Sequence, residues 1–113
     1  MNAAAPGVRV LVYHRTPESG ELAEAYRRAA ELLAGTDGLL RHELLRSPGD
    51  RELHVLVMDW ADRDAFTGWE RALRHAHHPS PLRRYQDRSR PGGHYEIHLL
   101  VSRDGSTPCE SSP

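Results

Sequence analysis

The sequence predicts a small α+β domain of the ferredoxin-like (βαββαβ) kind, in which two helices cover one face of a four-stranded antiparallel sheet. Two segments carry apolar residues at helical spacing, and four others are rich in β-branched and apolar residues. Their order along the chain is strand, helix, strand, strand, helix, strand. Two strand–helix–strand crossovers around a hairpin are typical of a split βαβ sheet, and short right-handed connections leave few other topologies.

We expect this single domain to occupy residues 8–101 of the 113-residue chain. Residues 1–7 precede the first strand pattern and are predicted to be flexible. Residues 102–113 contain several Ser and Pro and show no hydrophobic periodicity, so we expect a disordered C-terminal tail there.

The first crossover begins with a β-branched run over Val8–His14, which predicts a strand. Turn and helix-start residues follow at 16–20, and Gly35 is placed to end the helix as its C′ residue. Between them lies an apolar stripe at helical spacing, formed by Leu22, Ala25, Tyr26, Ala29, Leu32 and Leu33.

A hairpin is predicted next, with strands over Leu39–Arg46 and Glu52–Trp60 and a loop of Ser, Pro, Gly and Asp over 47–50. Asp62 has a side chain suited to an N-cap and therefore marks the start of the second helix. The apolar stripe of that helix consists of Ala65, Phe66, Trp69, Ala72 and Leu73.

The remainder of the domain is mostly polar. Residues 75–93 predict a loop with a short helical turn near Leu82–Tyr85, and His94–Val101 predicts the last strand. With both helices on one face of the sheet, the other face needs cover, and its candidate side chains include apolar ones. A second copy packed sheet to sheet is the simplest cover, so we expect a homodimer.

Composition excludes several classes of function. The 15 basic residues are all Arg, so a Schiff-base lysine is ruled out, and the net charge of −1 with no basic block argues against a nucleic-acid partner. The only cysteine is Cys109, which fits a reduced, cytoplasmic setting. The start lacks the features of a signal peptide, and no apolar run is long enough to cross a membrane.

The segment around the second helix resembles the antibiotic biosynthesis monooxygenase family. The family pattern Trp–x–Ser/Asp–x–Glu/Asp–Ala–Phe–x–x–Trp is met by Trp60, Asp62, Asp64, Ala65, Phe66 and Trp69. A second family pattern, Gly–Leu followed by Leu–Leu–x–Ser, is met by Gly38, Leu39, Leu44, Leu45 and Ser47. The resemblance runs from about Val8 to Val101 and implies dimeric α/β barrels built from ferredoxin-like halves.

The family includes cofactor-free oxygenases of aromatic polyketides and haem-degrading enzymes. Haem degraders carry an Asn late in the first strand, where this chain has His14, and its only Asn is Asn2, so the comparison argues against haem breakdown. The Asn that some polyketide oxygenases use near the second helix is also missing. The resemblance implies that Trp69 matches a family Trp and His75 a family His, with His77 and His78 competing for that role.

The leading hypothesis is therefore a monooxygenase of secondary metabolism that acts with O₂ on a polycyclic aromatic, polyketide-type substrate. No phosphate loop, nucleophile elbow or flavin fingerprint is present, so no cofactor is implied, and no carboxylate or Cys completes a metal site around His75. The substrate itself would react with oxygen. Two other hypotheses stay open: a polyketide cyclase or isomerase that works without O₂, and a non-catalytic haem- or small-ligand-binding module.

Histidine supplies the candidate bases, His54 and His75, and Trp69 is the third candidate catalytic residue. If Leu44 pairs with His54, then His42 pairs with Leu56 and both imidazoles share one face of the sheet. Candidate substrate-binding residues are His14, Tyr26, His42, Trp60, Phe66, Arg84 and Tyr85. Structural alternatives stay open for all of them: a solvated helix end at His75, a dimer-interface role for His42 and His54, core packing for the tryptophans, and a solvated loop around Arg84.

Overall fold

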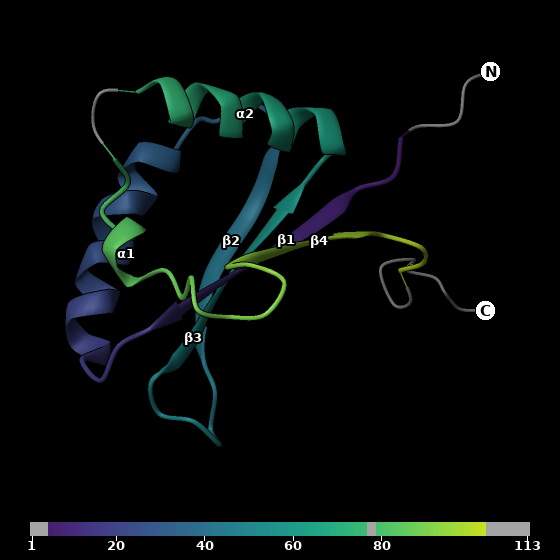
Figure 1. Cartoon of the computed structure of the whole chain (residues 1–113). Coiled ribbons are helices and arrows are strands. Elements are labelled where there is room, and N and C mark those ends of the chain that lie inside the picture. The colour runs from purple at the N-terminus through teal and green to yellow at the C-terminus, as the bar shows by residue number, and fades with distance from the viewer. Residues whose placement is uncertain (1–4, 77–78, 104–113) are drawn as a thin grey trace, which may run out of the picture.

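The computed structural model describes residues 5–76 and 79–103. It confirms the ferredoxin-like fold, with the four strands antiparallel in the order β2-β3-β1-β4. Figure 1 shows α1 and α2 lying to one side of the sheet. The elements are β1 (Val8–Arg15), α1 (Ser19–Leu33), β2 (Leu39–Arg46), β3 (Leu53–Trp60), α2 (Arg63–His75), the 3₁₀ turn η1 (Arg83–Tyr85) and β4 (Tyr95–Leu99). The predicted last strand, His94–Val101, is thus longer than β4 at both ends, and the predicted tail from residue 104 onward lies outside the described residues.

The helix ends follow the chemistry of the sequence. Asp62 caps α2 as predicted, since its carboxylate accepts a hydrogen bond of 2.8 Å from the backbone N–H of Ala65. Gly35 adopts φ +78° just after the last residue of α1 and its C-cap, a conformation that costs glycine little. The start of α2 and the end of α1 therefore lie near the positions that local side-chain chemistry sets.

The predicted pairing of Leu44 with His54 is wrong by two residues. Leu44 pairs with Leu56, and His42 pairs with Met58. The loop is longer than expected because Leu53 N–H donates to the carbonyl of Asp50, which closes a separate turn before β3 begins. A shift of two residues preserves the sidedness of each strand, so His42 and His54 still share one face.

The core lies between the sheet and the helices. Alternate residues of β1 and β3 point into it, since Val8, Val10 and Val12 are buried opposite Trp60, Met58 and Leu56. The helices add Leu22, Ala25, Ala29 and Phe66, and the loop before η1 adds Leu82. The strand residues between these inward ones lie on the opposite face of the sheet.

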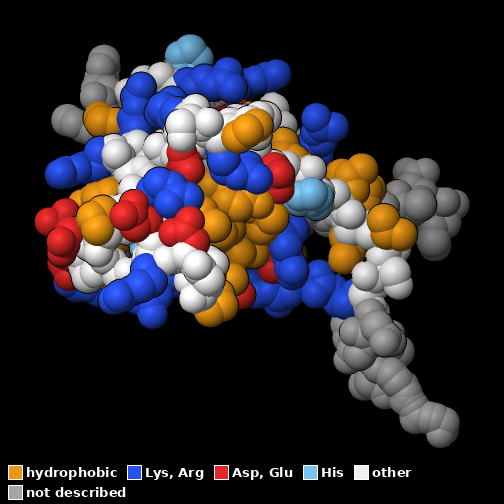
Figure 2. All heavy atoms as spheres, turned by 60° about the horizontal axis from the view of Figure 1, so that its bottom comes forward, with side chains coloured by type: hydrophobic (Ala, Val, Ile, Leu, Met, Phe, Trp, Pro, Cys, Tyr) orange, Lys and Arg blue, Asp and Glu red, His pale blue; other side chains and the backbone are white. Residues whose placement is uncertain are grey.

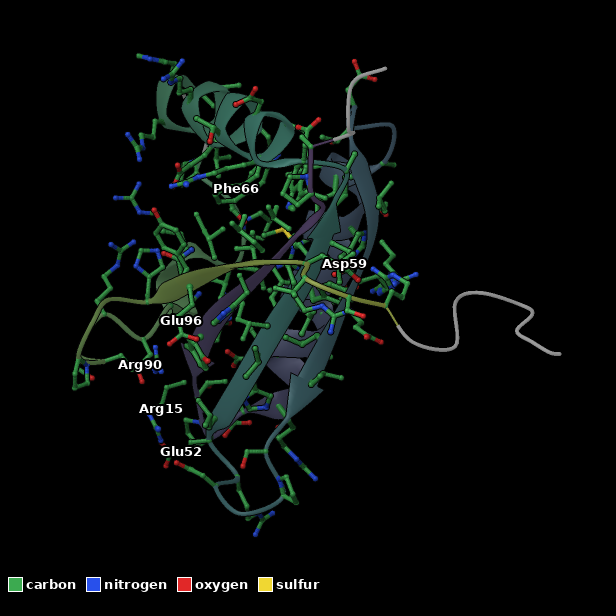
Figure 3. The ribbon with its side chains drawn as sticks, turned by 90° about the vertical axis from the view of Figure 1, so that its right-hand side faces the viewer. Arg15, Glu52, Asp59, Phe66, Arg90 and Glu96 are labelled. Atoms are coloured by element: carbon green, nitrogen blue, oxygen red, sulfur yellow. The ribbon has the colours of Figure 1, made fainter. Side chains whose placement is uncertain are left out.

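None of the helices and strands that the structure describes covers that opposite face. Charged pairs lie along it: Figure 3 shows Arg90 beside Glu96, at 3.4 Å, and Arg15 beside Glu52, at 4.0 Å. Figure 2 shows an exposed apolar patch with arginines and acidic side chains around it. No helix within residues 5–76 and 79–103 has the length and apolar character needed to cross a bilayer.

Gly38 and Gly35 offer a matched test of this packing. Both have positive φ, so alanine costs about 1–2 kcal/mol at either position. A Cβ at Gly38 would also lie 2.4 Å from the Cβ of Ala65 in α2, whereas a Cβ at Gly35 meets nothing within 4 Å. We expect Gly38→Ala to lower the free energy of unfolding by about 1–3 kcal/mol more than Gly35→Ala, measured by urea denaturation. Equal losses would show that the β2–α2 contact is looser than described.

Candidate active site

A cavity of about 100 Å³ lies beneath α2, between that helix, the sheet and the segment before η1. A second cavity of about 120 Å³ lies toward α1 and shares six wall residues with the first, among them Ser80 and Leu82. We call the pair the helix-side cavity, with an α2 lobe and an α1 lobe. The α2 lobe is lined by Val12, His14, Leu56, Met58, Phe66, Trp69, Glu70, Leu73, Ser80, Leu82, Gln86, His94 and Tyr95.

His14 is the fully buried polar group in the wall of the α2 lobe, with 0% of its surface exposed. Its Nδ1 lies 3.0 Å from the carbonyl oxygen of Val12. Because a carbonyl can only accept, the ring proton sits on Nδ1 and leaves a bare lone pair on Nε2. Nε2 is buried and has no hydrogen-bond partner among the described residues.

The environment keeps this imidazole neutral. Burial lowers the pKa of His14 to about 4, although its hydrogen bond to Val12 acts in the opposite direction. The nearby His54 and His94 lower the pKa a little further. At neutral pH, His14 is therefore an uncharged base with a free acceptor nitrogen.

A second group of polar side chains lies in the same wall. Burial lowers the pKa of His94, with a contribution from Arg88, while Glu70 opposes both. Burial also raises the pKa of Tyr95, and the Glu70 carboxylate raises it further. The α2 lobe therefore offers two neutral imidazoles and a protonated phenol within an otherwise apolar enclosure.

Aromatic rings form the roof of the α2 lobe. Phe66 and Trp69 project from the apolar stripe of α2, with ring centroids 6.1 Å apart, and Figure 3 shows Phe66 beneath that helix. Trp60 supports both rings at centroid distances of 5.7 and 5.5 Å. It is only 1% exposed and does not line either lobe.

The two predicted bases lie away from the helix-side cavity. His54 is buried, and both of its ring nitrogens are occupied: Nε2 lies 2.8 Å from Ser19 Oγ and Nδ1 lies 2.9 Å from the carbonyl of Glu52. His54 is the second residue of β3, contacts the first residue of α1 and lines neither lobe. His75 is the exposed last residue of α2, while His77 and His78 lie outside the described residues.

Four predicted substrate-binding residues also lie outside both lobes. Tyr26 Oη lies 2.6 Å from Nδ1 of His42, which joins α1 to β2. Tyr85 donates a hydrogen bond of 3.0 Å to Glu21, and the guanidinium of Arg84 lies 5.1 Å from the Tyr85 ring centroid. Of the ten predicted site residues, the structure brings together His14, Phe66 and Trp69 around the cavity.

The sequence analysis missed several wall residues, notably Gln86 and His94. Gln86 pairs with His14 in an isolated β-bridge, and the carbonyl of His94 accepts a 2.7 Å hydrogen bond from the backbone N–H of Tyr13. Both residues belong to irregular segments, where no periodicity indicates which side chains turn inward. Within the segment between α2 and β4, Leu82 is an apolar residue in a polar loop, and this contrast indicates that its side chain turns inward.

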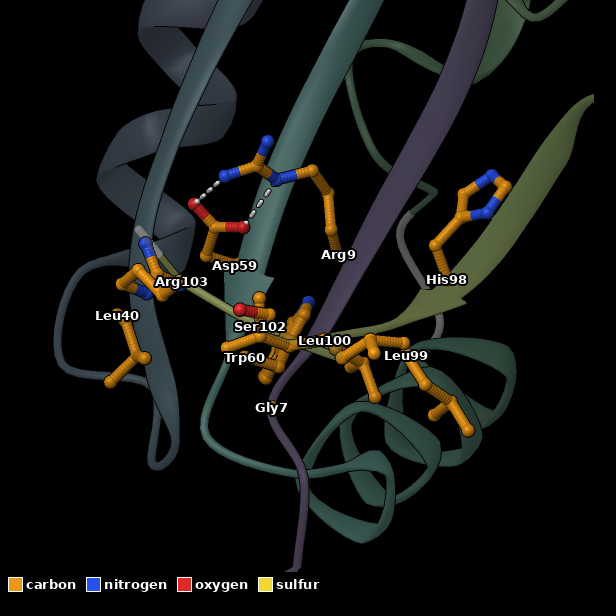
Figure 4. Close-up of a pocket in the computed structure, with 12 residues that line it drawn as sticks. Gly7, Arg9, Leu40, Asp59, Trp60, His98, Leu99, Leu100, Ser102 and Arg103 are labelled. Carbon is orange, nitrogen blue, oxygen red and sulfur yellow. Dashed lines mark hydrogen bonds and ion pairs between the residues drawn. The ribbon is translucent and has the colours of Figure 1, made fainter. Parts of the chain in front are cut away.

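A separate, open hollow of about 770 Å³ lies at the end of the sheet where the chain leaves β4 (Figure 4). Its carboxylate, Asp59, is held between Arg9 and Arg41, each at 2.8 Å. Burial opposes ionisation, but the two guanidiniums hold the pKa of Asp59 below its usual range. Among the described residues, no three His, Cys, Asp or Glu side chains are grouped to hold a metal ion.

The stability of the fold should report the burial of His14. In the unfolded chain its pKa returns to about 6.5, so between pH 6.5 and 4 the unfolded state takes up a proton that the native state refuses. Stability is therefore lost as the pH falls through that window, by about 2–3 kcal/mol from this residue. Urea unfolding at pH 7 and pH 4.5 should show this extra loss in the wild type and not in His14→Leu. Equal losses in both proteins would contradict the assignment.

Comparison with known proteins places the fold. The family model described as antibiotic biosynthesis monooxygenase matches residues 7–78. The chain belongs to this family. The matched region contains His14, Phe66 and Trp69 but ends before Gln86 and His94. The resemblance found in the sequence is thereby confirmed.

Two solved structures of similar fold are described by different activities. SnoaB from Streptomyces nogalater, a cofactor-independent oxygenase, shares 26% identity with a TM-score of 0.59, over 91% of this chain and 99% of SnoaB. The heme-degrading protein Rv3592 from Mycobacterium tuberculosis shares 20% identity with a TM-score of 0.65, and the match covers 89% of this chain and 98% of the Rv3592 chain. No curated protein gives a significant sequence match.

Proposed function

We propose that this chain is a cofactor-independent monooxygenase of secondary metabolism, acting on a polycyclic aromatic, polyketide-type substrate. The observation that carries the proposal is His14, which lines a cavity roofed by Phe66 and Trp69 and has a buried Nε2 without a hydrogen-bond partner among the described residues. Membership of the monooxygenase family and the likeness to SnoaB support it. The base differs from those that the sequence favoured, because His54 is bound to Ser19 and His75 is exposed.

In the proposed reaction, His14 Nε2 removes a proton from a phenol or an activated carbon acid of the substrate. The resulting electron-rich anion transfers electrons to O₂, one oxygen atom forms a carbonyl on the ring, and the other leaves as water. For anthrone the products are anthraquinone and water, so the substrate supplies the electrons and no separate reductant is consumed. The protein contributes the base, the cavity and stabilisation of the anion.

A pKa of about 4 does not prevent this role. Burial disfavours the imidazolium, and Glu70 in the same wall is not among the groups that shift the pKa of His14. Proton transfer creates the substrate anion and the imidazolium together, and the two attract strongly where water is excluded. The neutral imidazole is also the form present throughout the physiological pH range.

The size of the cavity constrains the bound state. The two lobes have volumes of about 100 and 120 Å³, whereas ligand sites usually measure roughly 300–1,000 Å³. A fused-ring substrate would have to occupy both lobes and displace Leu82, which lines both and is 3% exposed. Substrate entry is therefore expected to move the segment before η1.

We also propose that the protein works as a cytoplasmic homodimer that pairs through the uncovered face of the sheet. By register, this face carries Leu11, Leu45, Leu53, Val55 and Val57 between its charged residues. Leu45 is 48% exposed in the single chain. Burial of such residues against a second copy would remove apolar surface from water at both sheets.

The proposal is tested by incubating the protein with anthrone in an oxygen electrode. We expect O₂ consumption above the uncatalysed rate, with one anthraquinone formed for each O₂ consumed and no turnover without oxygen. Activity on polyketide substrates that persists unchanged without O₂ would instead favour the cyclase or isomerase hypothesis. Absence of turnover combined with a Soret band on haem addition would favour a binding module.

A further inference from the structure

Four arginines surround an open depression next to the helix-side cavity. Arg28 from α1, Arg83 and Arg84 from η1, and Arg88 from the following loop line a hollow of about 810 Å³; we call them the arginine rim. The other described residues that line this hollow are Pro79, Ser80, Pro81 and Gln86, and none of them carries a carboxylate.

The rim shares walls with the candidate site. Ser80 borders the hollow and both lobes, and Gln86 borders the hollow and the α2 lobe beside His14. Arg88 also acts electrostatically on His94 in the cavity wall. The hollow therefore lies directly outside the segment that a fused-ring ligand must displace.

Little negative charge on the protein balances this rim. Arg28 shares Glu24 with Arg27, at a distance of 3.8 Å from its own guanidinium. Arg84 lies over the ring of Tyr85, and Arg88 donates a hydrogen bond to the neutral side chain of Gln86. Four arginines therefore line one hollow with Glu24 as the carboxylate that the structure places against one of them, and an anion that enters the hollow would be attracted by their combined charge.

We infer that the arginine rim binds a carboxylate carried by the aromatic substrate, with the ring system held in the helix-side cavity. This inference rests on the proposed function, since it takes the cavity as the site of the rings. Guanidinium groups bind carboxylates through paired, charge-assisted hydrogen bonds, which gives direction as well as affinity. The rim would orient one end of the substrate while His14 acts at the other.

Binding rather than turnover tests the inference. Anthraquinone-2-carboxylate and anthraquinone-2-carboxamide are already oxidised, so neither is turned over. They share the ring system and differ in one substituent, which is a charged carboxylate in the first and a neutral amide in the second. Their affinities can be measured by calorimetry and by quenching of tryptophan fluorescence. We expect the carboxylate to bind about tenfold more tightly at low salt, about 1.4 kcal/mol, and the preference to shrink as NaCl is added.

Variants locate the effect. The double substitution Arg83→Gln with Arg84→Gln should bring the affinity for the carboxylate down to that for the carboxamide and leave the carboxamide unchanged. Arg51→Gln, an exposed charge loss in the β2–β3 loop, should leave both affinities as they are. Circular dichroism checks that each variant is folded.

The outcomes separate the inference from the function on which it rests. Equal binding of both compounds by the wild type would overturn the inference and leave the aromatic cavity intact. A preference that persists in the double variant would remove the rim as its source. Binding of neither compound would contradict the aromatic cavity and, with it, the inference.

Discussion

Replacing His14 with Ala is expected to lower kcat/KM for anthrone oxygenation by about 10²–10⁴-fold, the usual contribution of a positioned general base. Among the described residues of the α2 lobe, His14 combines complete burial with an acceptor nitrogen that has no partner. His75→Ala is the matched control, and it should leave the rate nearly unchanged because His75 is exposed at the end of α2. Unaltered turnover in His14→Ala would exclude His14 as the base.

The pH profile of the wild type provides an independent readout. Since burial lowers the pKa of His14 to about 4, kcat/KM should stay level from pH 8 to about 5 and fall only as the pH approaches 4. An exposed histidine base would instead give an inflection near its ordinary pKa of about 6.5. An inflection there would contradict the assignment of His14 as the base.

Trp60→Ala is expected to lower the free energy of unfolding by about 3–5 kcal/mol, a large part of the roughly 5–15 kcal/mol that stabilises a domain. Trp60 is 1% exposed and contacts both Phe66 and Trp69. Its removal would leave a cavity behind the aromatic roof of the site. The measurement is denaturant unfolding, with ligand quenching as a second readout.

Trp60→Phe is the matched control. It keeps an aromatic ring and removes Nε1, which is buried without a hydrogen-bond partner among the described residues. Because an unpaired buried donor costs about 1–3 kcal/mol, this gain should offset much of the lost volume. A loss as large as that of Trp60→Ala would show that the full indole shape, rather than aromatic packing, supports the roof.

Periodicity in the sequence identifies some of the residues that line the cavity from regular elements. Helical spacing placed Phe66 and Trp69 on the inward stripe of α2, and Asp62 marked where that helix begins. Strand alternation put His14 on the same side as Val12. Alternation alone does not say which side faces the helices; that is decided by the burial of the valines of β1 against them.

The remaining parts depend on contacts between distant segments. His54 shares a face with His14, and the two pair across β1 and β3, yet Ser19 at the start of α1 occupies it. The irregular segment between α2 and β4 supplies Gln86, His94 and most of the arginine rim, to which α1 adds Arg28. Backbone hydrogen bonds to Tyr13 hold this segment against β1. No local pattern encodes such contacts, so the sequence indicated histidines as candidate bases but not which of them line the cavity.

The most direct test of the account is the protonation and environment of the His14 ring, measured by ¹⁵N NMR of the imidazole nitrogens. We predict that His14 is neutral at pH 5.5 with its proton on Nδ1, and that anthraquinone-2-carboxylate shifts its Nε2 resonance while those of His75 stay unchanged. A His14 ring that titrates near pH 6.5, or an Nε2 resonance that the ligand does not move, would contradict the account.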